Sequence, residues 1–167
     1  MRKVKALVVD DEISVCEAVK AILEGDGIEV FTTTSSPTAL EQIKTTLYDL
    51  IISDLKMPGM DGIQLYDTVK DIIPDSIFII ITAYGTIASA VDAIKQGIHD
   101  YIPKPFTPDE VRIPVRRALE KKTLEKENIA FRAYIGMGRE IPIIAKSEGM
   151  GKVLSMIDGM KDSDCSV

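Results

Sequence analysis

Residues 50–62 read LIISDLKMPGMDG, and this stretch decides the fold. Residues 50–52 are apolar at successive positions, which is typical of a strand that is covered on both faces. Ser53 and Asp54 follow this short run, and Pro58 with Gly59 marks a turn soon afterwards. We therefore expect Asp54 at the carboxyl end of a buried strand in a parallel sheet.

Four other short runs rich in Val, Ile or aromatic residues alternate with helix-length segments. The expected strands are residues 6–9, 29–32, 50–53, 77–81 and 101–102. Apolar residues spaced three or four apart predict crossover helices over residues 13–23, 39–47, 63–69 and 87–94. Strands that alternate with helices predict an α/β fold with a doubly wound, five-stranded parallel sheet.

A last helix is expected to begin at Thr107, which can act as its N-cap, with Pro108 at the first helical position. The helix continues as a charge-dense segment that fits a helical linker or a short coiled coil, although Pro114 predicts a bend. After Phe131 the composition changes. We therefore divide the chain into a domain over residues 1–120, a helical linker over 121–140 and the truncated start of another domain over 141–167.

Composition excludes several functions. A net charge of -6 and a pI near 4.9 argue against binding of a phosphate backbone by the whole chain. The chain has no apolar run long enough for a membrane span and no signal peptide, so we expect a cytoplasmic protein. Cys16 and Cys165 fit neither a disulfide framework nor a zinc site, and His99 is expected to be structural.

Polar residues follow four of the expected strands. Asp10 and Asp11 follow the first, Asp54 the third, Thr82 the fourth, and Lys104 the fifth. The carboxyl ends of parallel strands share one edge of the sheet, where ligands bind. Three carboxylates at one site repel each other unless a cation is present, and hard oxygen ligands suit Mg²⁺. Asp54 could then attack a phosphodonor, with Lys104 offsetting charge on the phosphoryl oxygens.

These residues lie in four segments, 8–12, 54–62, 82–85 and 101–106, which together resemble the receiver domain of two-component response regulators. The resemblance covers residues 1 to about 120. It implies the flavodoxin-like, CheY-like fold with strand order 2-1-3-4-5. It also implies that Asp54 accepts a phosphoryl group from a histidine kinase, as a self-catalysed phosphoacceptor switch rather than an independent enzyme.

The resemblance implies roles for the neighbouring residues too. Asp10, Asp11, Asp54 and the backbone carbonyl of Lys56 would hold Mg²⁺. Thr82 would bind the phosphoryl group, and Lys104 would pair with it. Thr82 and Tyr101 would form the switch that carries the signal away from Asp54. The Lys104-Pro105 bond resembles a cis peptide of the family.

The tail resembles a second family. Residues 143–147 and 162–167 look like the start of the AAA+ ATPase domain of NtrC-like, sigma-54-dependent activators. This implies a homodimer through receiver and linker, and a full-length protein that binds DNA, ATP and sigma-54 RNA polymerase, which this fragment does not. Residues 149–152 do not form a phosphate-binding loop, because the required glycine and hydroxyl residues are missing.

Two other classes of protein use a similar architecture. A haloacid-dehalogenase-like phosphatase also forms an aspartyl-phosphate, but it needs a DxD motif after the first strand, where this chain has Asp10-Asp11-Glu12. A flavodoxin-like electron carrier needs a Ser/Thr/Gly-rich phosphate cradle in the same loop, which is absent from the sequence. The receiver is therefore favoured.

Overall fold

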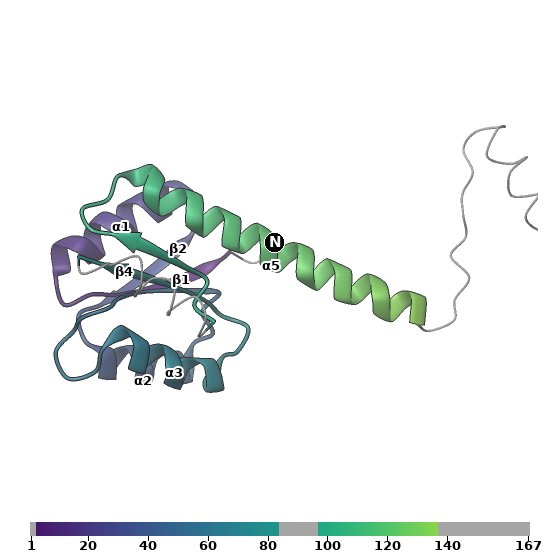
Figure 1. Cartoon of the computed structure of the whole chain (residues 1–167), viewed down its shortest axis with the longest axis horizontal. Coiled ribbons are helices and arrows are strands. Elements are labelled where there is room, and N and C mark those ends of the chain that lie inside the picture. The colour runs from purple at the N-terminus through teal and green to yellow at the C-terminus, as the bar shows by residue number, and fades with distance from the viewer. Residues whose placement is uncertain (1–2, 84–96, 137–167) are drawn as a thin grey trace, which may run out of the picture. The chain divides into compact units, whose positions relative to one another are not determined.

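The computed structural model describes residues 3–83 and 97–136. Its described strands form one parallel sheet in the order β2-β1-β3-β4-β5, which confirms the predicted order (Figure 1). The strands are β1 Lys5–Val9, β2 Glu29–Thr33, β3 Leu50–Asp54, β4 Ile77–Thr82 and β5 Asp100–Pro103. Each observed strand is slightly longer than its prediction, so that Asp54 and Thr82 are themselves the last residues of β3 and β4.

Helices cover both faces of this sheet. They are α1 Ile13–Gly25, α2 Ser36–Thr45, α3 Gly62–Ile72 and α5 Pro108–Gly136. Helices α2 and α3 lie on one face, and α1 lies with the first turns of α5 on the other (Figure 1). The helix expected over residues 87–94 lies outside the described residues. No helix in the described ranges combines the length and the apolar character that a membrane span requires.

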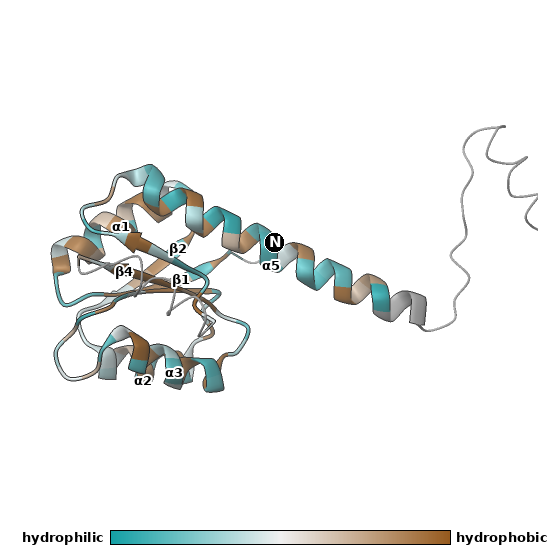
Figure 2. Cartoon of the chain, viewed as in Figure 1, coloured by the Kyte–Doolittle hydropathy of each residue, from teal (hydrophilic) through white to brown (hydrophobic). Residues whose placement is uncertain are grey.

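The strands are apolar at successive positions because their side chains pack in two separate cores, one on each face of the sheet. Successive side chains of a strand point to opposite faces of the sheet. Val8 therefore packs with α1 and α5, whereas its neighbour Leu7 packs with α2 and α3. The colouring of Figure 2 shows the apolar strands between the helices. Full burial of one such side chain contributes about 1.5–3 kcal/mol, so these two cores dominate the stability of the fold.

Helices α3 and α5 each begin after a capping residue, which for α5 is the predicted Thr107. The Asp61 carboxylate accepts a hydrogen bond from the backbone N–H of Gln64 at 2.7 Å, and the Gln64 side chain accepts one from the Asp61 N–H at 3.2 Å. Thr107 and Glu110 form the same reciprocal pair at the start of α5. Each pair satisfies backbone donors that the first turn of a helix leaves without a partner.

The structure corrects one local expectation. Helix α2 ends at Thr45, so Leu47 lies beyond it with an exposed side chain instead of continuing the apolar stripe. Helix α5 is continuous through Pro114, and the bend expected there stays a prediction. A proline removes one helical hydrogen bond, but Val111 and Val115 are buried on either side of it. Packing of these two residues on the sheet holds the helix in place.

His99 extends the pairing of β4 with β5. Its backbone N–H donates to the carbonyl of Phe78 at 2.8 Å, and its ring nitrogen Nδ1 accepts from the Phe78 N–H at 3.2 Å. Nδ1 can accept this bond only while it carries no proton. Partial burial lowers the pKa of His99, and the nearby charges of Lys121 and Lys122 lower it further, against a smaller opposing effect of Glu125. The neutral ring is the form that fits the fold.

We expect His99 to make the free energy of unfolding fall as the pH drops. The unfolded chain takes up a proton near the ordinary pKa of 6.5, whereas the folded chain takes it up only at lower pH. Denaturant unfolding at several pH values from about 7 to about 5 measures this loss. The control is His99→Asn, whose amide oxygen can accept the same bond without titrating. Parallel pH curves for the two proteins would contradict the role of His99.

Candidate functional site

The residues predicted for the site lie together at the carboxyl edge of the sheet. Asp10 follows β1, and Asp54 ends β3, the strand that pairs with β1 on one side and with β4 on the other. Thr82 ends β4, and the backbone N–H of Lys104 donates to its carbonyl at 2.9 Å. Asp10 and Asp54, which are 44 positions apart in the sequence, therefore meet because β1 and β3 are neighbours.

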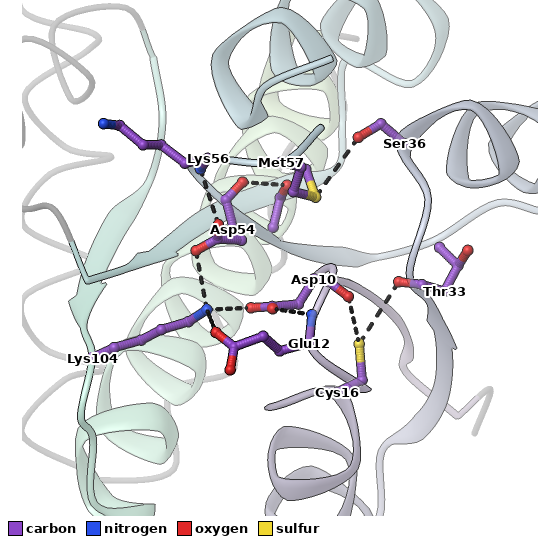
Figure 3. Close-up of polar contacts among 10 residues, drawn as sticks. Asp10, Glu12, Cys16, Thr33, Ser36, Asp54, Lys56, Met57 and Lys104 are labelled. Atoms are coloured by element: carbon purple, nitrogen blue, oxygen red, sulfur yellow. Dashed lines mark hydrogen bonds and ion pairs between the residues drawn. The ribbon is translucent and has the colours of Figure 1, made fainter. Parts of the chain in front are cut away.

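The centre of the site is the ammonium group of Lys104. Its Nζ lies 2.7 Å from Oδ2 of Asp10, 3.2 Å from Oδ1 of Asp54 and 3.7 Å from Oε1 of Glu12 (Figure 3). The side chain of Lys104 is 13% exposed and those of Asp10 and Asp54 are 2% and 7% exposed, whereas Glu12 is largely exposed. Electrostatic attraction is stronger away from water, so the contacts to the two aspartates dominate.

Both aspartates are held in the same way. In Asp10, Oδ1 accepts a hydrogen bond from the backbone N–H of Glu12 at 2.9 Å, while Oδ2 faces Lys104. In Asp54, Oδ2 accepts from the backbone N–H of Lys56 at 3.0 Å, while Oδ1 faces Lys104. The side chain of Lys56 itself extends away from the cluster (Figure 3). Backbone geometry therefore fixes the orientation of both carboxylates.

Burial and charge act against each other on these groups. Burial raises the pKa of Asp10, and the hydrogen bond from Lys104 only partly offsets this effect. For Lys104, burial lowers the pKa, but the contacts with Asp10 and Asp54 outweigh burial, so the pKa lies above its ordinary value. Lys104 is therefore a cation at neutral pH. It balances the negative charge of the carboxylates at this edge of the sheet.

The first residue of α3, Gly62, packs closely against the backbone of Asp54. The Gly62 N–H donates to the carbonyl of Leu55 at 2.9 Å. A Cβ atom at position 62 would overlap the carbonyl oxygen of Asp54 and would lie 3.1 Å from Cδ1 of Ile80. Only glycine permits this close approach. The turn after Asp54 can thus return to the sheet within eight residues.

Thr82 and Tyr101, the two residues of the predicted switch, differ in burial. Thr82 is buried at the end of β4, whereas Tyr101 is half-buried in β5, where it pairs with Ile80. The Lys104-Pro105 bond is cis, as the resemblance implied. The role of Thr82 and Tyr101 as a switch remains a prediction.

The predicted metal ligands are brought together only in part. Asp11 is exposed and makes no hydrogen bond or ion pair within residues 3–83 and 97–136. The same residues contain no group of three or more Asp, Glu, His or Cys side chains arranged to hold a metal ion. Mg²⁺ nevertheless binds proteins through one or two carboxylates and keeps several waters. The two fixed carboxylates of Asp10 and Asp54 fit that requirement.

Cys16 and Ser36 contact the site, and sequence reasoning missed both. The buried thiol of Cys16 lies 3.5 Å from the carbonyl of Asp10, and burial raises its pKa to about 11. The buried hydroxyl of Ser36 contacts the turn after Asp54. Nothing in the pattern separates Cys16 from an ordinary core residue, or Ser36 from its neighbouring serines.

Comparison with known proteins identifies the family. The family model of the response regulator receiver domain matches residues 6–116. The chain belongs to this family. Over 160 residues it is 33% identical to the C4-dicarboxylate transport transcriptional regulatory protein DctD of Rhizobium meliloti, covering 95% of this chain and 35% of that protein. The chain thus spans about a third of the length of such curated relatives.

Solved structures agree with this assignment. The beryllofluoride-activated NtrC4 receiver domain dimer is 36% identical, with a TM-score of 0.67, over 71% of this chain and 98% of that chain. NtrX from Brucella abortus, in complex with ADP, is 30% identical, with a TM-score of 0.73, over 94% of this chain and 35% of that chain. The similarity to NtrX therefore extends beyond the receiver.

We expect Gly62→Ala to destabilise this receiver by about 1–3 kcal/mol, because the added methyl group must displace the backbone of Asp54. Urea unfolding measures the loss. Gly25→Ala is the matched control, since a Cβ there meets only Nη2 of Arg112 at an ordinary 3.8 Å, and alanine favours the helix. Equal stability of the Gly62→Ala variant and the wild type would refute the close approach.

Proposed function

We propose that Asp54 is the phosphoacceptor of this receiver and that a histidine kinase is its phosphodonor. The observation that carries the proposal is the fixed carboxylate of Asp54, with Oδ2 bound by the Lys56 N–H and Oδ1 facing Lys104. A carboxylate that is held in one orientation beside a cation is prepared for attack on an electrophile.

The reaction transfers one phosphoryl group. A carboxylate oxygen of Asp54 forms a bond to phosphorus as the bond between phosphorus and the donor nitrogen of the kinase histidine breaks, and the bonding pair stays on that nitrogen. Negative charge spreads over the phosphoryl oxygens during transfer. Lys104, already 3.2 Å from Asp54, offsets part of that charge.

The same residues would hold Mg²⁺. Asp10, Asp54 and the backbone carbonyl of Lys56 are the proposed ligands, and Asp11 would contribute from the exposed side of the site. When bound, the ion supplies positive charge to the phosphoryl oxygens. The carboxylates of Asp10 and Asp54 both contact the Lys104 ammonium group, and their closeness to one positive charge supports this assignment.

Thr82 and Tyr101 are proposed to convert phosphorylation into a signal. Thr82 lies on the strand next to Asp54, and its carbonyl is bonded to the N–H of Lys104. Phosphorylation adds charge and acceptor oxygens beside these groups. A hydrogen bond from the Thr82 hydroxyl to the phosphoryl group would draw Thr82 toward Asp54, and Tyr101 would follow on the neighbouring strand.

We further propose that the signal controls dimerisation. A related receiver, NtrC4, is a dimer when activated by beryllofluoride. In this chain, Leu124 of α5 is 65% exposed, and Phe131, seven residues later, is also exposed. A spacing of seven is typical of the apolar seam of a coiled coil. The linker helix would therefore pair with that of a second copy.

The output proposed for the full-length protein is transcription activated by a sigma-54-dependent ATPase. The similarity to DctD, a transcriptional regulatory protein, and to NtrX in complex with ADP supports this. DNA, ATP and sigma-54 RNA polymerase would be partners of that longer protein in the cytoplasm, and residues 141–167 would begin its ATPase domain. These residues lie outside the described part of the chain.

Asp54→Asn should abolish labelling of the protein by acetyl phosphate, because the amide cannot form the acyl phosphate. Intact-mass spectrometry detects the added phosphoryl group, and chelation of Mg²⁺ should suppress it in the wild type. Asp71→Asn, at an exposed position of α3, is the control and should be labelled normally. Labelling that persists in the Asp54→Asn protein would assign the phosphoryl group to another residue.

Leu124→Gln should weaken the dimer that forms with beryllofluoride. Burial of one leucine side chain contributes about 1.5–3 kcal/mol, so we expect the dissociation constant to rise about tenfold or more. Sedimentation velocity measures the shift. Glu127→Gln, an exposed change on the same helix, is the control. A dimer that is insensitive to Leu124→Gln would exclude the linker seam.

A further inference from the structure

The buried hydroxyl of Ser36 forms a hydrogen bond between helix α2 and the turn that follows Asp54. Ser36 is the first residue of α2 and is only 1% exposed. Its Oγ donates a hydrogen bond to the carbonyl of Met60 at 2.9 Å and lies 3.7 Å from Sδ of Met57. Figure 3 shows Ser36 reaching toward Met57 from outside the acidic cluster. We call residues 55–61, between β3 and α3, the acceptor loop.

Main-chain bonds fix the two ends of the acceptor loop. At its start, the Leu55 N–H donates to the carbonyl of Ile81 at 3.1 Å. At its end, the Gly62 N–H returns to the carbonyl of Leu55 at 2.9 Å. Between these points the loop must place the backbone N–H of Lys56 within hydrogen-bonding distance of the Asp54 carboxylate. Ser36 acts on this middle part, because Met57 and Met60 are the residues that it contacts.

We propose that Ser36 is a positioning residue for the phosphoacceptor site. Its hydroxyl holds the acceptor loop in the conformation in which the Lys56 N–H reaches Asp54 and the Lys56 carbonyl is available to Mg²⁺. Without the hydroxyl, the carbonyl of Met60 loses its donor, and the loop shifts to recover one from water or the backbone. This inference rests on the metal ligands of the proposed function.

The chain contains a matched control for the loss of a buried serine hydroxyl. Ser76 is also buried, and its Oγ donates to the carbonyl of Tyr48 at 2.6 Å. It precedes β4, so it lies at the amino end of the sheet, opposite to the site. Ser36→Ala and Ser76→Ala remove the same kind of bond. Only the first should affect the acceptor loop.

The test compares Mg²⁺ affinity by isothermal titration calorimetry in the wild type, Ser36→Ala and Ser76→Ala, at a temperature at which circular dichroism shows all three folded. We expect Ser36→Ala to weaken Mg²⁺ binding about tenfold, the usual cost of losing a group that orients a metal ligand. Ser76→Ala should bind like the wild type. Equal affinities in all three proteins, or equal losses in both variants, would overturn the proposal.

A second measurement needs no metal. Amide hydrogen exchange over residues 55–61 should be faster in metal-free Ser36→Ala than in the wild type, and unchanged in Ser76→Ala. Ser36→Cys serves where the alanine variant does not fold, because a thiol keeps a weaker donor in nearly the same space. It should fall between serine and alanine in both measurements. Loop exchange as slow as in the wild type would refute the role of the hydroxyl.

The outcomes separate this inference from the function on which it rests. Wild-type protein that fails to bind Mg²⁺, or labelling that persists in Asp54→Asn, would overturn the proposed function and this inference together. Wild-type binding with an unaffected Ser36→Ala variant would overturn only the role of Ser36.

Discussion

The Lys104 ammonium between Asp10 and Asp54 is the interaction on which the site depends. Two buried carboxylates at one edge of a sheet repel each other, and a nearby cation offsets this repulsion. Lys104 supplies that cation from the loop after β5, at 2.7 Å and 3.2 Å. The carboxyl end of β5 must therefore lie at the same edge as those of β1 and β3, and the parallel pairing of these strands through β4 places it there.

The rest of the fold makes this arrangement rigid. The strands lie between two close-packed apolar cores. Because such cores deform little, the carboxyl ends of the strands have little freedom to move apart. Backbone N–H groups then orient each carboxylate, and the close approach at Gly62 sets the path of the chain after Asp54. Rigid elements thus carry the aspartates, and the loops between them complete the site.

The sequence predicted the strands and the central charges because both follow from local rules. Runs of apolar residues mark buried strands, and polar residues at their ends must meet in a parallel sheet. The cap at Thr107 was equally local. Ser36 and Leu47 were not predictable in this way. The burial of Ser36 depends on which turn lies beside it, and the exposure of Leu47 depends on where α2 ends; both are set by tertiary packing.

Each aspartate divides its two oxygens between a backbone N–H and Lys104, and this division has a thermodynamic consequence. Under the proposed metal assignment, a divalent cation that bound to Asp10 and Asp54 would compete with the Lys104 ammonium group for the same carboxylates. Its affinity would then be the difference between two sets of contacts, and the occupancy of the site would follow the concentration of the ion.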